Sequence, residues 1–392
     1  MSRLAVRAGW LLSLDRQVGN HRNGGVLIED GRIVEVGPDV RPRGAELIDV
    51  PDGILIPGFV DSHRHVWEAA HRHVLTGSLD SAPQPPSDPE QVYRATLVGL
   101  LGSLEAGVTT VVDHVDLPPE YLEAVTQAHR DGGVRTVLAT EPDTPTPDLP
   151  PDTTAAAALP GSADAASAWQ AARRRGARIH THLGSDPSHR GQAAALARAG
   201  LLGPDVTVAH PVHLDSTDFA AIGSAGGSVA VAAQAEMAAG LGNPPMQEMI
   251  DHGVGIGLAV GSERFAPPDL FAAMRAAISV QHAVHFDLKL AGKGGLPSLM
   301  TTRDVIRYAT VGGAVAAGLG ETCGSITPGK AADLVVLRTD LPNIHPINDP
   351  IGAVVWGMDT FNVGWVLVGG RRMVEDGGLV SPVAVPVSEG SR

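Results

Sequence analysis

The middle of the chain alternates short apolar segments with longer amphipathic ones, and this alternation restricts the fold more than any other feature. Apolar runs of about four to eight residues that end at turn residues are typical of buried strands. Strands separated by helices form parallel sheets, and eight of them can close into a (β/α)8 barrel. The predicted strands are residues 54–60, 108–114, 134–140, 155–159, 177–182, 206–210, 228–232 and 255–260. The fourth has the weakest strand pattern.

The two ends of the chain lack helical periodicity and have the pattern of β-structure. Residues 25–37 are predicted to form two strands joined at the turn dipeptide Asp30-Gly31, and residues 332–337 and 365–374 add further strands. We therefore predict one composite β-sandwich domain from residues 1–52 and 325–392, around a barrel of residues 53–324. Two unrelated β flaps are the alternative interpretation.

Histidines recur where the predicted strands end. His63 and His65 are two residues apart, so on an extended segment both imidazoles point to the same side. A single histidine at such a place is usually structural, but the pattern repeats at two further strand ends, with His180 and His182 and with His210 and His213. Three or four imidazoles that leave one position open for water make a catalytic zinc site.

The composition disfavours nucleic acids and membranes as partners. The net charge is −14, from 29 basic and 43 acidic residues, which disfavours nucleic acid and an anionic membrane surface. One cysteine, Cys323, excludes a disulfide framework and suits a reducing cytoplasm. The sequence lacks the apolar segment of a signal peptide or a membrane span. We expect a cytoplasmic bacterial protein with a small-molecule substrate, for which a homo-oligomer is compatible with the sequence.

Several motifs resemble the amidohydrolase superfamily. PGFVDSHRH at residues 57–65 resembles its first metal motif, and GSITPGKAADLV at 324–335 resembles its return into the β-sandwich. VHLD at 212–215, QAEM at 234–237 and DLFAAMR at 269–275 resemble the branch of cytosine, guanine and S-adenosylhomocysteine-type deaminases and triazine chlorohydrolases. The resemblance implies one divalent ion, zinc or alternatively iron, bound by His63, His65 and His182. It also makes His210 the strand-six histidine that binds metal or substrate, while His180 and His213 are expected to be supporting.

Two residues depart from the family pattern. Ser185 occupies the place of a proton-shuttling glutamate, and Gly261 that of the metal-contacting aspartate that acts as general base. Glu263, Asp186 and Glu68 are candidates for a relocated base, and each is alternatively an ordinary surface carboxylate. Other residues near the predicted strand ends are candidates for substrate binding: Trp67, Glu68, His114, Asp116 and Glu236.

The sequence therefore predicts a metal-dependent amidohydrolase-type hydrolase, a deaminase or related enzyme, acting on a non-peptide C–N bond of a small cyclic or heteroaromatic substrate. Because both family carboxylates are missing, two alternatives stay open. One is a repurposed enzyme that catalyses an elimination, cyclisation or isomerisation in a biosynthetic pathway. The other is a non-catalytic homologue.

Overall fold

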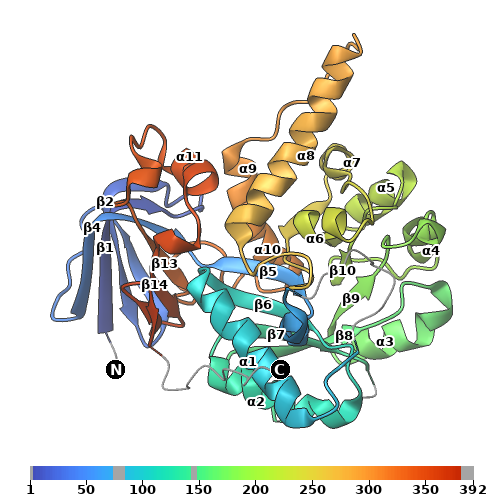
Figure 1. The fold of residues 1–392 in the computed structure, drawn as a ribbon, viewed down its shortest axis with the longest axis horizontal. Coiled ribbons are helices and arrows are strands. Elements are labelled where there is room, and N and C mark those ends of the chain that lie inside the picture. Colours follow the sequence, from blue (N-terminus) through green and yellow to red (C-terminus); the bar gives the residue numbers. More distant parts are fainter. Residues whose placement is uncertain (1–2, 74–83, 143–147, 381–392) are drawn as a thin grey trace.

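The computed structural model describes residues 3–73, 84–142 and 148–380, and it contains two eight-stranded sheets (Figure 1). One is parallel throughout, with its strands in chain order. Its strands are β5 (Phe59–Arg64), β6 (Val108–His114), β7 (Arg135–Thr140), β8 (Thr153–Ala158), β9 (Arg178–His182), β10 (Val206–Ala209), β11 (Ser228–Val231) and β12 (Gly255–Leu258). The predicted (β/α)8 barrel is confirmed, and the weakly predicted fourth strand is present as β8.

The barrel closes between its first and last strands. A parallel bridge joins Arg64 to Gly261, where the Gly261 amide donates to the His63 carbonyl at 3.0 Å and the His65 amide donates to the Gly261 carbonyl at 2.9 Å. The Asp61 side chain adds a further link, because its carboxylate accepts from the Val260 amide at 2.9 Å. The first metal motif, on β5, therefore lies directly beside the end of β12.

Helices surround the parallel sheet, and their ends follow ordinary capping rules. The Asp88 side chain caps α1 by accepting from the Glu90 amide, with Pro89 in the first turn. Gly133, at φ +68°, ends α2 in the left-handed conformation that glycine tolerates. The α-helices are α1 (Pro89–Glu105), α2 (Leu122–Gly132), α3 (Ala166–Arg174), α4 (Gln192–Arg198), α5 (Ser216–Ser224), α6 (Ala233–Ala238), α7 (Met246–Asp251), α8 (Leu270–Leu290), α9 (Thr302–Arg307), α10 (Gly313–Ala316) and α11 (Pro350–Gly352).

Short 3-10 and π segments complete the helical part. One of them, η1 (Val66–His71), follows the first barrel strand and packs against α1. The others are η2 (Pro119–Tyr121), η3 (Ala163–Ala165), η4 (Pro187–His189), η5 (Tyr308–Gly312), η6 (Pro342–Ile344), η7 (Ala353–Gly357) and η8 (Thr360–Asn362). Among the described residues, no helix combines the length and apolar character needed to cross a membrane.

The second sheet is built from both ends of the chain, as predicted, and lies beside the barrel (Figure 1). Its order is β16-β15-β14-β13-β4-β1-β2-β3, and all neighbours are antiparallel except β1 and β4. The strands are β1 (Arg3–Leu12), β2 (Asn20–Glu29), β3 (Arg32–Gly37), β4 (Glu46–Pro57), β13 (Leu334–Arg338), β14 (Val363–Val368), β15 (Arg371–Glu375) and β16 (Gly378–Leu379).

The predicted strand over residues 54–60 is two strands in the structure. Its first half ends β4 in the terminal sheet, and its second half begins β5 in the barrel. The break falls at Gly58, where a Cβ atom would lie 2.0 Å from Thr109 Oγ1. The exact domain division at residues 52 and 325 stays a prediction, while the strands of the terminal sheet reach Pro57 and resume at Leu334.

Candidate metal and active site

Five histidines gather at the carboxyl ends of the barrel strands, where (β/α)8 enzymes carry their active sites. His63 lies in β5 and His65 just beyond it, His114 and His182 end β6 and β9, and His210 follows β10. The His63 ring is central: its centroid lies 5.1 Å from that of His65, 5.4 Å from His114, and 4.9 Å from both His182 and His210. Strands far apart in the sequence thus bring their terminal imidazoles into one cluster.

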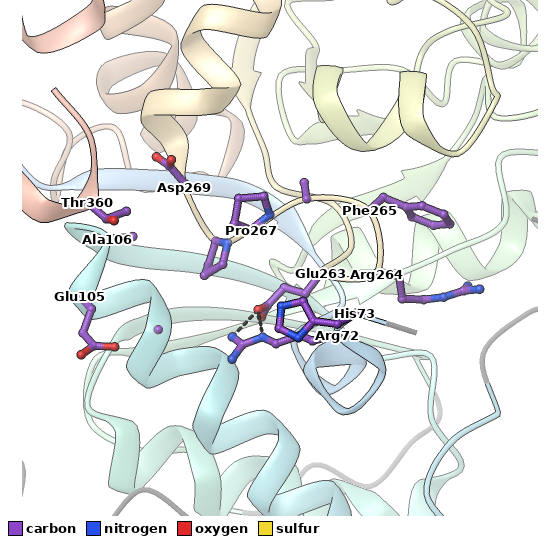
Figure 2. A pocket seen from close by; sticks show the side chains of 13 residues that line it. Arg72, His73, Glu105, Ala106, Glu263, Arg264, Phe265, Pro267, Asp269 and Thr360 are labelled. Carbon is purple, nitrogen blue, oxygen red and sulfur yellow. Dashed lines mark hydrogen bonds and ion pairs between the residues drawn. The ribbon is translucent and has the colours of Figure 1, made fainter. Parts of the chain in front are cut away.

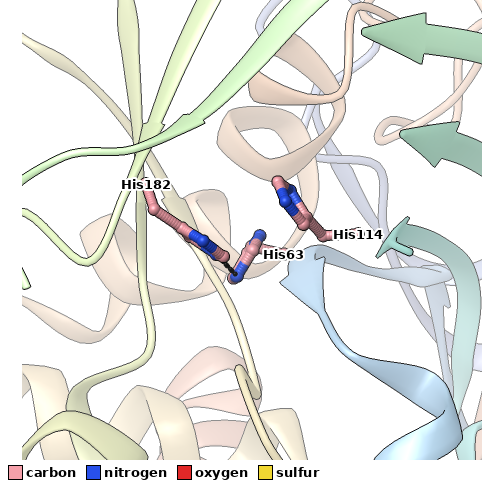
Figure 3. Close-up of side chains that lie close together, drawn as sticks. All are labelled: His63, His114 and His182. Carbon is pink, nitrogen blue, oxygen red and sulfur yellow. Dashed lines mark hydrogen bonds between the residues drawn. The ribbon is translucent and has the colours of Figure 1, made fainter. Parts of the chain in front are cut away.

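Three of these histidines could hold a metal ion together. Ring nitrogens of His63, His114 and His182 all lie within 4.8 Å of one another (Figure 3). The Nε2 atoms of His63 and His182 are 3.1 Å apart, and the rings of His114 and His182 stack at 4.3 Å between centroids. Two ring nitrogens this close need a proton or a cation between them.

The electrostatics of these three residues suit a metal ligand set. Burial, reinforced by the neighbouring imidazoles, lowers the pKa of His63, His114 and His182 well below the ordinary value for histidine. The rings are therefore neutral and offer lone pairs, as metal ligation requires. The Nδ1 atoms of His63 and His114 are buried without a hydrogen-bond partner among the described residues. These residues fit a divalent cation such as zinc.

His65 is oriented by a carboxylate. Its Nδ1 atom lies 3.2 Å from Oδ1 of Asp116, which also accepts from the indole of Trp67 at 2.8 Å. Burial opposes protonation of His65, but the hydrogen bond and charge of Asp116 outweigh it and raise the pKa to about 9. A carboxylate behind a histidine is a common arrangement around metal sites, because it fixes the tautomer and the ring orientation.

His210 is held in the same manner by Glu236. Its Nδ1 atom lies 3.1 Å from Oε1 of Glu236, and the Ala232 amide donates to that oxygen at 3.0 Å. Glu236 is fully buried, and its second oxygen has no partner among the described residues. His210 has φ +56°, an uncommon backbone conformation for a non-glycine residue and one that concentrates at functional sites. The contact directs the other ring nitrogen of His210 away from Glu236.

A cavity of about 160 Å³ adjoins the histidine cluster. Two buried carboxylates line it: Glu236, and Glu68, whose carboxylate accepts from the Ser262 hydroxyl. The remaining lining residues are His65, His210, Ala235, Ala239, Leu241, Ser262, Arg264 and Phe265. The structure thus brings Glu68 and Glu236, two of the predicted substrate-binding residues, to one small space beside the histidines.

The structure gives two of the three candidate bases other partners. Glu263 is buried and forms an ion pair with Arg64. It forms a second ion pair with Arg72 (Figure 2). Asp186 is exposed and caps η4, where it accepts from the amide and hydroxyl of Ser188. Neither carboxylate therefore contacts the histidine cluster.

Gly261 lies against the cluster in the left-handed backbone conformation, which glycine adopts without strain. Its φ is +74°, and a Cβ atom would lie 2.8 Å from the Ala232 Cβ and 3.2 Å from Cε1 of His210. A side chain at residue 261 would therefore point toward His210, but the space is already filled. His180 lies buried one step down β9; burial lowers its pKa to about 3, and neither ring nitrogen has a partner among the described residues.

Sequence reasoning placed His114 in the substrate pocket, whereas the structure places it among the metal-capable nitrogens. The rule applied to the other histidines would have found it, because His114 also ends a predicted strand. Arg64 and Ser262 were missed altogether. Arg64 stands between the two histidines of the first motif, and only the fold shows that its side chain is buried against Glu263.

Known proteins similar to this chain match it along nearly its whole length. A 5'-deoxyadenosine deaminase from Methanosarcina barkeri is 25% identical, with 96% of this chain and 94% of that protein covered. A 5-methylthioadenosine/S-adenosylhomocysteine deaminase from Natronomonas pharaonis is 28% identical, with coverage of 96% and 93%.

Solved structures show the same fold. An adenosine deaminase from Xanthomonas campestris with bound zinc gives a TM-score of 0.81 at 19% identity, covering 97% of this chain and 94% of that one. An atrazine chlorohydrolase from Arthrobacter aurescens complexed with zinc gives 0.82 at 21% identity, covering 96% of each chain.

The model of the amidohydrolase family matches residues 54–373, which include all eight barrel strands and most of the second terminal segment. This match and the named relatives confirm the predicted resemblance and the predicted enzyme class, an amidohydrolase-type hydrolase of non-peptide C–N bonds. The chain belongs to the amidohydrolase family.

Proposed function

We propose that this protein is a metal-dependent deaminase that hydrolyses an amino group from a small heteroaromatic ring. The observation that carries the proposal is the cluster of five histidines beside a cavity with two buried carboxylates. The relatives named as deaminases of adenosine derivatives support this reaction. The single free cysteine, Cys323, supports a reducing, cytoplasmic location, and the net charge of −14 supports a small-molecule substrate rather than nucleic acid.

For the metal we propose one divalent ion, zinc, bound by His63, His65 and His182, with His114 as the fourth imidazole within reach. A bound zinc ion supplies a Lewis acid that makes a water molecule nucleophilic near neutral pH. Asp116 supports this assignment for His65, because it faces Nδ1 and leaves Nε2 as the atom that would bind a cation, with release of the Nε2 proton. Iron is the alternative metal, since imidazole binds both.

The protein's own groups have distinct roles in this reaction. Glu236 holds the Nδ1 side of His210, so Nε2 of His210 can accept the proton of the attacking water and return it to the leaving nitrogen. The free oxygen of Glu236 and the carboxylate of Glu68 accept hydrogen bonds from N–H groups of the substrate. Hydrolysis then forms a ring C–O bond, breaks the C–N bond and releases ammonia.

A non-hydrolytic reaction in the same pocket is the second candidate. The observation in its favour is that Gly261 provides no carboxylate and that Glu263 and Asp186 have partners outside the cluster. An elimination, cyclisation or isomerisation would release no ammonia, so the same measurement separates the two candidates.

The test combines elemental analysis with ammonia release from a panel of amines: adenosine, 5'-deoxyadenosine, cytosine, guanine and an amino-triazine. We expect the wild type to contain about one zinc ion per chain and to release ammonia from at least one amine. His63→Ala/His65→Ala should lose both properties, whereas His252→Ala, at a surface histidine that contacts Ser216, should keep both. Metal content unchanged in the double variant would refute the ligand assignment, and metal binding without ammonia release would favour the second candidate.

A further inference from the structure

Arg64 is the residue between the two histidines of the first motif. Its side chain is fully buried, and its guanidinium has several polar partners. Its guanidinium donates to Ser103 Oγ at 2.6 Å and to the Gly99 carbonyl at 3.1 Å, and it forms an ion pair with Glu263. Ser103 and Gly99 belong to α1, so the end of β5 is fixed to that helix through a single side chain.

Glu263 connects this arginine to a second one. One of its carboxylate oxygens pairs with Arg64, and only 5% of the residue is exposed. The other oxygen pairs with Arg72 (Figure 2). Arg72 directly follows η1, the segment that carries Trp67 and Glu68. Glu263 therefore joins the end of β5, the end of η1 and the loop after β12.

The same loop forms one wall of the cavity. Ser262 and Arg264, on either side of Glu263, both line it, and the Ser262 hydroxyl donates to Glu68. Two residues earlier, Gly261 exchanges backbone hydrogen bonds with His63 and His65. The position of these histidines relative to the cavity wall is thus set by backbone bonds at Gly261 and by ion pairs at Glu263.

We infer that Glu263 is a positioning residue whose ion pairs with Arg64 and Arg72 hold His63 and His65 in place to bind the metal. The inference rests on the proposed metal site and assigns Glu263 no contact with substrate or with the reacting atoms. A buried carboxylate between two guanidiniums is rigidly held, because each oxygen has a charged partner and little solvent competes. Partners that hydrogen-bond directly to a ligating histidine commonly affect metal affinity about 10- to 100-fold. Glu263 acts one step further away, through Arg64 and the loop after β12, so we expect an effect at the lower end of that range.

The test replaces Glu263 with glutamine, which keeps the shape of the side chain and removes its charge. Asp333→Asn is the matched control, because Asp333 is also buried and also pairs with an arginine, Arg135, through contacts of 2.6 and 3.1 Å. That pair lies at the junction of β7 and β13, in a different part of the fold from the histidines. Both variants should melt at lower temperature than the wild type.

Metal binding then separates positioning from general stability. In chelator competition we expect Glu263→Gln to bind zinc about tenfold more weakly, and its cobalt-substituted form to show an altered visible spectrum, whereas Asp333→Asn should match the wild type in both. Glu263→Gln with wild-type affinity and spectrum would overturn the inference, and a loss of turnover alone would then point to Glu263 as a base.

Two further outcomes are covered by the same assay. If Glu263→Gln does not fold, Arg72→Gln removes one of the two ion pairs at a partly exposed side chain. We expect about threefold weaker zinc binding for Arg72→Gln, and unchanged affinity would overturn the inference. A wild-type protein that binds no metal would overturn the proposed function, and this inference with it; normal wild-type binding with unchanged variants would overturn the inference alone.

Discussion

At the scale of single residues, the site depends on which nitrogen of each imidazole is available. In two of the five rings a carboxylate contacts the Nδ1 atom: Asp116 contacts that of His65, and Glu236 contacts that of His210. The remaining rings are kept neutral by burial. The tautomer of the His65 and His210 rings is therefore decided by carboxylates from outside the strands, one in the loop after β6 and one in α6.

Replacement of Glu236 by glutamine should separate orientation from packing. The amide fills the same volume but is a weaker acceptor for His210 and for a substrate N–H group, so we expect turnover to fall about 10²-fold with little change in zinc content. Glu248→Gln, at an exposed carboxylate on α7, is the control. Steady-state ammonia release measures the effect, and turnover equal to that of the control would contradict the proposed role.

Replacement of Gly261 by aspartate tests whether the family's usual carboxylate can be restored. From the sequence alone either a gain or a loss of activity is possible, whereas the structure predicts a loss. The backbone is left-handed at φ +74°, and a Cβ atom would lie 2.8 Å from that of Ala232. We expect Gly261→Asp and Gly261→Ala both to be destabilised by about 1–3 kcal/mol and both to lose activity. A stable and faster Gly261→Asp variant would show that the site can adapt to the carboxylate.

At the scale of elements, the junction between β4 and β5 connects the terminal sheet to the barrel strand that carries the first metal motif. One apolar run supplies the end of a terminal-sheet strand and the start of a barrel strand, and Gly58 separates them. The Gly58 amide donates to the Asp333 carbonyl at 2.9 Å, and the next residue, Phe59, donates to the Gly107 carbonyl. Consecutive residues thus contact two different parts of the molecule.

Gly58→Ala should loosen this junction. Its Cβ atom would lie 2.0 Å from Thr109 Oγ1, so β5 or β6 must shift, at a cost of about 1–3 kcal/mol typical of overpacking. Gly294→Ala is the control, because no atom of the described residues lies within 4 Å of the added methyl group and the backbone is not left-handed there. Denaturant unfolding measures both variants, and equal midpoints would show that the junction tolerates a side chain.

At the scale of the whole molecule, strand ends that are up to about 150 residues apart form one site, since His63 contacts both His182 and His210. A ligand that binds only this assembled state stabilises the entire barrel. Removal of metal by a chelator should therefore lower the melting temperature, and re-addition of zinc should restore it, with about 2.7 kcal/mol expected when free zinc is 100 times its Kd. His63→Ala/His65→Ala should not respond to either treatment; a chelator effect of equal size in that variant would place the metal elsewhere.

The sequence alone determined the fold class and most of the strands. The apolar periodicity located eight barrel strands, including the weak fourth one, because buried parallel strands must be continuously apolar between helices. It also located the histidines at strand ends and assigned both termini to one β-structure. These features depend on the spacing of residues that are near one another in the sequence, so they can be predicted without the tertiary structure.

Only the tertiary structure decided how the charged groups pair. Whether Glu263 is a base or an ion-pair partner depends on Arg64 and Arg72, nearly 200 residues earlier in the chain. Whether Gly261 can carry a side chain depends on Ala232 and His210, which lie on other strands and loops. Sequence spacing determines the face of a strand on which a side chain lies. The neighbours of that side chain depend on closure of the barrel, because closure brings β5 against β12.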